Sequence, residues 1–162
     1  MISETDAEVT MEYVMRPIGV IQTPFRETRG MPIQPIFSQA IGRVEVLPEF
    51  ADGLQDLETF SHVILIYVLH CTNGYALRVK PFLDDVTRGL FTTRYPCRPN
   101  PIGISTVRLL ARRGAVLEVE GIDVLDGTPL LDIKPYVPDF DIKTDARAGW
   151  YENRPAGKQG RS

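Results

Sequence analysis

The chain has 162 residues, of which 43% are hydrophobic, so length and composition fit one globular domain with a sizeable core. A formal net charge of −3 excludes a protein that is basic throughout, although it leaves room for a local basic patch. Two cysteines without a CxxC pair exclude a disulfide scaffold and a zinc finger, and the absence of a long apolar run excludes a membrane span, so we expect a soluble cytoplasmic protein without a metal.

The first half of the chain alternates between strand patterns and breakers. Residues 1–12 predict a loose acidic leader, and "RPIGVIQT" at residues 16–23 predicts a first strand. The prolines of residues 24–35 exclude a helix and predict a long loop. The alternation within "AIGRVEVLP", residues 40–48, indicates a half-buried strand. Apolar residues spaced by three or four within residues 49–60 predict a short helix.

The second half predicts further strands. "SHVILIYVLH", residues 61–70, is short and β-branched, which favours a buried central strand. Further strand patterns occupy residues 76–82, 89–96, 103–111 and 115–125. Residues 143–162 are charged and small, which indicates a C-terminal tail. We therefore expect a mainly β fold over residues 13–142, a small coiled sheet or β-barrel with one or two short helices; without a G-x-G-x-x-G motif it is not a Rossmann fold.

The stretch "RYPCRPNPIGIS" is stiffened by prolines beside strand-forming residues. Pro99 and Pro101 exclude the helical conformation from Arg98 and Asn100 and hold both in extended backbone. Gly103 allows a ligand or a neighbouring strand to approach the backbone closely. Such a rigid connection suits a binding site, but it is equally consistent with a stiff β-connection whose arginines are solvated.

A second stretch, "DGTPLLDIKPYVPDFD", begins with the turn dipeptide Asp126–Gly127. Asp132, Lys134 and Tyr136 alternate with apolar residues and project to one side of an extended segment. A carboxylate, an ammonium and a phenol on one face would bind a polar ligand or tune each other's pKa. The alternative is an edge strand with solvated polar residues.

His62 and His70 bracket the apolar run, and such histidines are more often hydrogen-bonded rim residues than catalysts. Cys71 is equally typical of a small buried hydrophobic residue. No G-x-S-x-G elbow is present. The residues alone thus indicate a compact β domain with two rigid polar loops that would form one pocket.

Four stretches in this order resemble the TsaA-like family, also called the TrmO-type tRNA methyltransferases. They are "RPIGVIQTPF", "FSHVILIYVLH", "TRYPCRPNPIGIS" and "DGTPLLDIKPYVPDFD", within about residues 14–141. The resemblance implies a small β-barrel that binds S-adenosylmethionine (SAM) outside a Rossmann fold and works as a homodimer. It also implies methylation of N6 of threonylcarbamoyl-adenosine beside the anticodon of a tRNA.

The resemblance assigns cofactor contacts to several short segments. They map onto Pro32, Ile33, Gln34, His70, Cys71, Arg94, Ile104, Asp126, Gly127, Thr128 and Pro129. Ile33 stands where well-described members have arginine. Arg94 would meet the carboxylate of the methionine moiety. The candidate catalytic residues are Asp132, Lys134 and Tyr136, and Arg88, Arg98, Arg112 and Arg113 would contact tRNA phosphates.

Two rival functions remain open. One is a SAM-binding regulatory or assembly module without catalysis, which the replacement of the arginine by Ile33 favours. The other is a methyltransferase that acts on another RNA or on a small molecule. Bacterial members often carry an added C-terminal domain, for which we expect no room after residue 142.

Overall fold

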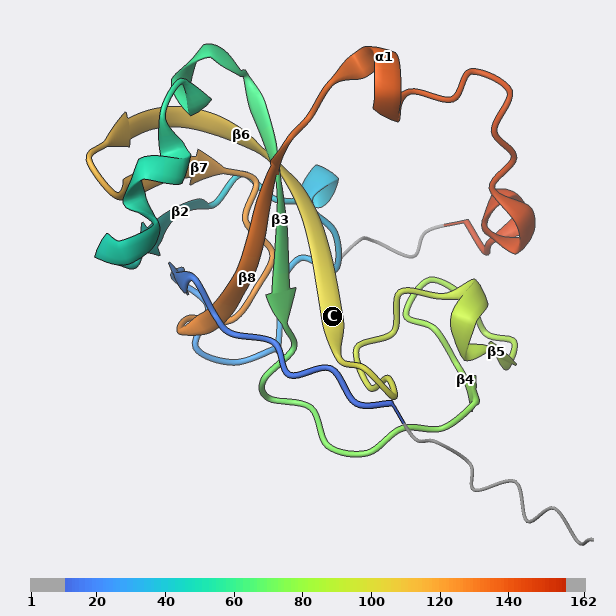
Figure 1. The fold of residues 1–162 in the computed structure, drawn as a ribbon. Coiled ribbons are helices and arrows are strands. Elements are labelled where there is room, and N and C mark those ends of the chain that lie inside the picture. Colours follow the sequence, from blue (N-terminus) through green and yellow to red (C-terminus); the bar gives the residue numbers. More distant parts are fainter. Residues whose placement is uncertain (1–10, 157–162) are drawn as a thin grey trace, which may run out of the picture.

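The centre of the computed structural model, which describes residues 11–156, is a closed antiparallel barrel (Figure 1). Within these residues six strands close it in the order β1-β2-β7-β6-β3-β8. Their bounds are β1 Gly19–Gln22, β2 Ile41–Val46, β3 His62–Val68, β6 Ile102–Arg113, β7 Val116–Glu120 and β8 Thr128–Pro135. The predicted mainly β fold is confirmed, and the antiparallel pairing differs from the parallel sheet of a Rossmann fold.

The core fills the barrel because inward positions alternate with outward ones along each strand. In β3, Val63, Leu65 and Tyr67 are buried, whereas the residues between them are only half-buried. The predicted strand is therefore present, but only its inward face is fully buried. Its outward face is half-buried, because that face points away from the barrel core. The inward residues of the other strands include Ile21, Val44, Val107, Leu117, Val119 and Leu130.

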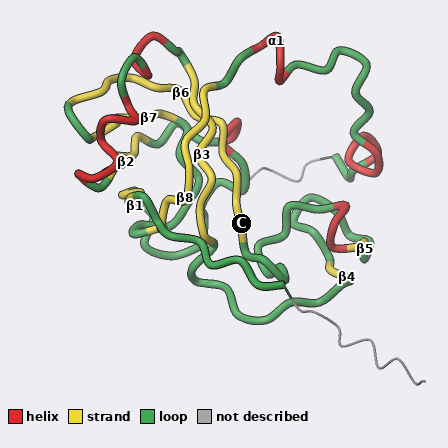
Figure 2. The backbone as a smooth tube through the Cα atoms, in the orientation of Figure 1, coloured by secondary structure: helices red, strands yellow, loops and turns green. Residues whose placement is uncertain are grey.

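Helical structure is short and mostly of the 3-10 type (Figure 2). The segments are η1 Pro35–Phe37, η2 Pro48–Leu54, η3 Leu57–Thr59, η4 Leu90–Thr92, η5 Gly149–Asn153 and the α-helix α1 Pro138–Asp141. The single helix predicted over residues 49–60 is wrong: Asp56 adopts a left-handed φ of 66° between η2 and η3 and interrupts it. No helix within residues 11–156 has the length and hydropathy needed to cross a bilayer.

Between β3 and β6 the chain leaves the barrel, and we call residues 69–101 the excursion. It carries the two-stranded ribbon of β4 (Arg78–Val79) and β5 (Arg88–Gly89), together with η4, and lies to one side of the barrel (Figure 1). The backbone N–H of Leu69 donates to the carbonyl of Pro101 at 2.7 Å and closes its base. The strand predicted at residues 76–82 is thus reduced to the two residues of β4. The strand predicted at residues 89–96 is wrong, because only Gly89 of this range belongs to β5 and Leu90–Thr92 form η4.

The described residues after 142 return to the excursion. The indole Nε1 of Trp150, in η5, donates to the carbonyl of Thr92 at 2.8 Å. The guanidinium of Arg88 lies 5.4 Å from the centre of the Trp150 ring. Parts of the predicted leader and tail, residues 1–10 and 157–162, lie outside the described residues.

Gly103 allows a close approach, as its position beside the prolines predicts. It opposes Tyr67 across the β3–β6 ladder, and a Cβ atom at Gly103 would lie 2.2 Å from Cε2 of that ring. The ring is buried and cannot move aside freely. Gly103→Ala should therefore lower the free energy of unfolding by about 1–3 kcal/mol, measured by urea denaturation.

The matched control is Gly53→Ala, because no atom lies within 4 Å of a Cβ added there. We expect that variant to retain the stability of the parent chain to within about 1 kcal/mol. Equal stability of the two variants would contradict the close packing of Gly103 against the ring.

Candidate functional site

Two segments that the resemblance assigns to the cofactor meet directly. Arg94 follows η4 in the excursion, and Gln34 lies in the loop between β1 and β2. The Nη1 atom of Arg94 donates to Oε1 of Gln34 at 2.6 Å, across a sequence separation of 60 residues. In the same loop Pro32 is buried and Ile33 half-buried, so the loop is held in place while Arg94 stays exposed.

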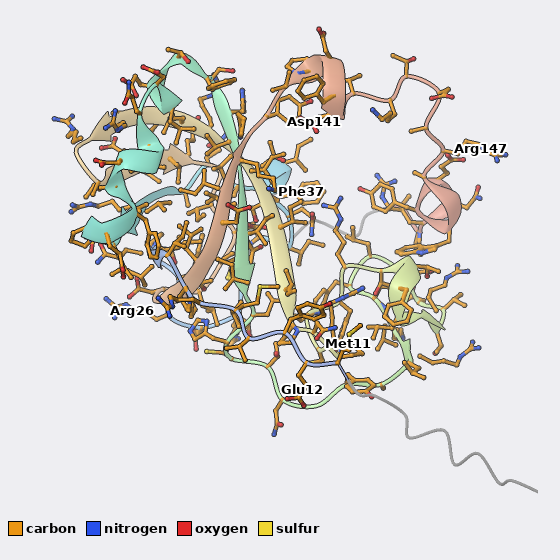
Figure 3. The ribbon with its side chains drawn as sticks, in the orientation of Figure 1. Met11, Glu12, Arg26, Phe37, Asp141 and Arg147 are labelled. Atoms are coloured by element: carbon orange, nitrogen blue, oxygen red, sulfur yellow. The ribbon has the colours of Figure 1, made fainter. Side chains whose placement is uncertain are left out.

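The Asp126 turn is attached to the base of the same loop. Oδ1 of Asp126 accepts the backbone N–H of Thr23 at 2.9 Å, and the N–H of Asp126 donates to the carbonyl of Phe25 at 2.7 Å. Arg26 lies 3.5 Å from Oδ2 of Asp126, beside the beginning of β8 (Figure 3). Gly127 adopts a φ of 80°, which only glycine adopts readily, and this conformation produces the sharp turn.

The side chains of the next two residues pack within the protein and are not open to a ligand. Thr128 is buried, and its hydroxyl donates to the carbonyl of Leu125 at 2.7 Å. Pro129 lacks an N–H and is half-buried. The exposed backbone at Gly127 is therefore the part of this turn that is open to a ligand.

A buried hydrogen-bond chain crosses the barrel interior, and the sequence reasoning missed it. The hydroxyl of Ser105 donates to Oδ1 of Asp123 at 2.5 Å and accepts from the hydroxyl of Tyr67 at 2.8 Å. The three residues come from β6, from the segment after β7, and from β3, so they tie these segments together. The signal for Ser105 is its inward position between the outward residues Ile104 and Thr106 in β6.

The positive charge of Arg94 acts on the hydrogen-bonded residues Tyr67 and Asp123. Burial raises the pKa of Asp123 to about 6, and the Ser105 hydrogen bond and the positive charge of Arg94 oppose the rise. Burial also raises the pKa of Tyr67, as does the neighbouring carboxylate of Asp123. Arg94 therefore lies near enough to the interior carboxylate to act on it, while its hydrogen-bonding partner Gln34 lies on the surface.

His70 and Cys71 emerge at the end of β3, and both are exposed. Because β3 is antiparallel to β6 and β8, this end lies beside the beginnings of those two strands. Ile104 lies in β6 opposite Ile66, on the outer face of the barrel, and is 50% exposed. It thus faces away from Ser105 and the interior.

The three candidate catalytic residues lie toward the C-terminal end of β8, away from the Asp126 turn. Nζ of Lys134 lies 2.9 Å from Oδ2 of Asp132, so these two do share one side of the strand. The backbone N–H of Tyr136 donates to the carbonyl of His62 at 3.1 Å, and the two rings meet edge to face at 6.1 Å. Tyr136 lies beyond the end of β8 opposite to Asp126, and the 8 residues of β8 that separate them span about 26 Å.

Asp132 also lines a hollow of about 390 Å³ beside η2. Its walls include Phe50, Leu54 and Ile133, so it is mainly apolar. Within residues 11–156 no group of three His, Cys, Asp or Glu side chains is arranged to hold a metal ion.

The four arginines predicted to contact phosphates fall into two separate groups. Arg88 and Arg98 lie in the excursion, whereas Arg112 and Arg113 lie at the far end of β6. Arg112 is paired there with Glu58, at 3.0 Å. Because the 12 residues of β6 span about 40 Å, the two groups do not form one surface.

Comparison with known proteins identifies relatives of this chain. Residues 20–142 match the family model described as the tRNA-methyltransferase O N-terminal domain. A probable S-adenosyl-L-methionine-binding protein of Pyrococcus abyssi is 54% identical over 85% of this chain and 75% of its own length. The tRNA (adenine(37)-N6)-methyltransferase of Escherichia coli is 36% identical over 87% of this chain and 65% of its own length.

Solved structures show the same fold. The crystal structure of TrmO from Pseudomonas aeruginosa superposes with a TM-score of 0.72 at 42% identity. The match covers 86% of this chain and 62% of that one. This chain therefore spans less than two thirds of several of the proteins it matches.

Proposed function

The chain belongs to the family of the tRNA-methyltransferase O N-terminal domain, and from this we propose that it is a SAM-dependent methyltransferase acting on N6 of an adenine in tRNA. The substrate is threonylcarbamoyl-adenosine in the anticodon loop, and the enzyme works in the cytoplasm. The observation that supports this most directly is the contact between Arg94 and Gln34, because it joins two segments to which the family resemblance assigns the cofactor.

The residues at this end of the barrel fit SAM chemically. A guanidinium has five N–H donors, and Arg94 is exposed after Nη1 donates to Gln34, so the remaining donors suit the carboxylate of the methionine moiety. Half-buried Ile33 offers an apolar surface to the adenine or the thioether region. The exposed backbone at Gly127 adds hydrogen-bonding groups. When bound, SAM supplies the electrophilic methyl group.

Catalysis in this proposal rests mainly on alignment. Displacement at a methyl carbon requires the nucleophile in line with the leaving sulfur, and rigid loops hold the reactants in that geometry. The N6 amine is a weak nucleophile because its lone pair is delocalised, so a proton acceptor helps. Of the three predicted catalytic residues, Asp132, whose carboxylate is ion-paired with Lys134, is the candidate for that acceptor, because Tyr136 lies beyond the far end of β8.

We further propose that two copies associate through the outer face of β3 and β6. Ile102 and Ile104 are 42% and 50% exposed, and they pair with the half-buried Val68 and Ile66. This continuous apolar stripe is the kind of surface that a second subunit covers. Because Ile104 is also among the residues assigned to the cofactor, the partner subunit would complete the site.

Ile104→Asp should therefore weaken dimer formation at least about 30-fold, because it buries an unpaired carboxylate in the interface. The measurement is light scattering after size-exclusion chromatography across a dilution series. Ile41→Asp is the matched control, since Ile41 is 53% exposed on β2, outside the stripe. A dimer that persists in the Ile104 variant and dissociates in the Ile41 variant would place the interface elsewhere.

Methyl transfer is tested with radiolabelled SAM and tRNA from cells that lack the N6 methyl group. We expect label in the tRNA, and digestion to nucleosides should locate it on N6 of threonylcarbamoyl-adenosine. Label in unmodified adenosine would retain the adenine-N6 activity but reject the carbamoylated substrate. If the chain binds SAM but transfers label to no tRNA, the proposal that it is a tRNA methyltransferase is rejected.

That last outcome corresponds to a second candidate function, a SAM-binding module without catalysis. Relatives from Pyrococcus abyssi and Archaeoglobus fulgidus carry the name S-adenosyl-L-methionine-binding protein, which mentions no transfer. The change to Ile33 favours this candidate as well, because it removes a charge from the loop beside Arg94.

A further inference from the structure

The excursion is electrically unlike the rest of the chain. It holds five basic residues and two acidic ones, a net charge of +3, whereas the whole chain has a net charge of −3. The basic residues are Arg78, Lys80, Arg88, Arg94 and Arg98. The remaining residues taken together therefore carry a net charge of −6, and this contrast favours an anionic partner at the excursion.

Two exposed cations, Arg78 in β4 and Lys80 directly after it, are arranged on one side. Arg78 and Lys80 are exposed and flank buried Val79, so they project in the same direction. Lys80 has only a 3.8 Å contact with exposed Asp85, which solvent screens. Arg88 differs, because it is held 2.7 Å from the buried carboxylate of Asp84 and is largely neutralised. Arg78 and Lys80 thus remain available to phosphates.

Aromatic rings accompany these cations on the surface. Phe91, in η4, is 73% exposed, and the guanidinium of Arg98 lies 5.8 Å from its ring centre. Phe82 is 46% exposed and stacks on Tyr95, with 5.5 Å between ring centres and 24° between planes. Exposed aromatic faces beside cations are the arrangement on which unpaired bases stack.

We propose that the excursion is the surface on which the single-stranded anticodon loop lies, with Arg78 and Lys80 on phosphates and Phe91 stacked on an unpaired base. The proposal rests on the proposed function and deepens it. The surface is continuous with the cofactor residues, because Arg94 belongs to the excursion and also contacts Gln34. A protein partner is the weaker choice because the surface combines its exposed rings with a net positive charge.

The phosphate contacts are tested with the double variant Arg78→Gln/Lys80→Gln. Its affinity for an anticodon stem-loop RNA is measured by fluorescence anisotropy over a series of salt concentrations. Losing two phosphate contacts should reduce the slope of log K against log salt by about 1.4. The matched control, Arg43→Gln/Arg108→Gln, removes the same charge from the barrel and should leave the slope unchanged. Equal slopes for the two double variants would overturn the assignment.

The stacking contact is tested with Phe91→Ala, which should weaken RNA binding by roughly 5- to 150-fold. Phe140→Ala is the control, because Phe140 is 72% exposed on α1, away from the excursion. Unchanged RNA affinity of the Phe91 variant would overturn the proposal, and so would a change in its oligomeric state without a change in RNA binding.

These measurements separate this inference from the proposed function. If the parent chain binds the RNA and the excursion variants weaken that binding, the surface is supported even where no methyl transfer is found. If the parent chain methylates tRNA while the excursion variants bind RNA normally, the activity stands and the surface is rejected.

Discussion

Arg94→Ala should weaken SAM binding by about 1.5–3 kcal/mol, or roughly 10- to 150-fold, in isothermal titration calorimetry. The variant removes the exposed guanidinium that we assign to the methionine carboxylate, and it also frees Gln34 from its 2.6 Å hydrogen bond. Arg94→Lys should bind with intermediate affinity, because it keeps the charge but loses the planar fork that binds a carboxylate with two hydrogen bonds.

The control for this experiment is Arg43→Ala, which removes an exposed arginine from β2 on the barrel. It should bind SAM as the parent chain does. If Arg94→Ala binds SAM with full affinity, Arg94 does not belong to the cofactor site, and the strongest support for the proposed function is lost.

Asp123→Asn should remove a large part of the pH dependence of stability. The folded-state pKa of Asp123 is raised from 3.8 to about 6 by burial, so the folded chain holds this proton more tightly than the unfolded chain does. The stability that this group contributes is therefore fully present below pH 3.8 and is lost as the pH rises through about 6. The shift corresponds to about 3 kcal/mol of unfolding free energy.

The measurement is urea denaturation of the parent chain and the Asp123→Asn variant at several pH values between 4 and 7.5. Comparing the two cancels the titration of other groups, since asparagine has a similar shape and no charge. Arg94→Ala adds a second check: its charge lowers the pKa of Asp123, so its removal should move the transition to higher pH. If the unfolding free energies of the parent chain and of Asp123→Asn change with pH in parallel, the raised pKa of Asp123 is contradicted.

The barrel was predictable because inward and outward positions alternate along its strands. Val63, Leu65 and Tyr67 point inward in β3, and this period of two appears directly in the apolar pattern. How deeply the outer face of β3 is buried was not predictable from this pattern. A continuous apolar run is typical of a strand buried on both faces, yet the outer face of β3 in this chain is only half-buried.

The helix at residues 49–60 shows where local periodicity fails. Its apolar spacing suits a helix, but η2 ends at Leu54 and Asp56 turns left-handed before η3 begins. Short 3-10 segments and an α-helix present similar apolar spacings over one or two turns, so the pattern does not distinguish between them. Packing against the barrel decides the outcome.

The candidate site was predictable only in part. Segments around Gln34, Arg94 and Asp126 were identified through their resemblance to a family, and the structure brings Gln34 and Arg94 into contact. The hydrogen-bond chain through Ser105 and Asp123 was missed, because a lone serine or aspartate in a strand pattern does not show which inward residue it will meet. Their proximity depends on the register of strands that are far apart in the sequence.

The local features follow from the sequence: period-two strands, proline-held connections and a turn at Asp126–Gly127, because steric limits on the backbone act between neighbouring residues. Which polar groups share an end of the barrel depends instead on how the strands pair. Closure of the sheet places Arg94 near Asp123 and carries Tyr136 and Arg113 to its far side. Contacts of that kind depend on strand pairing across the whole chain, which short-range preferences do not encode.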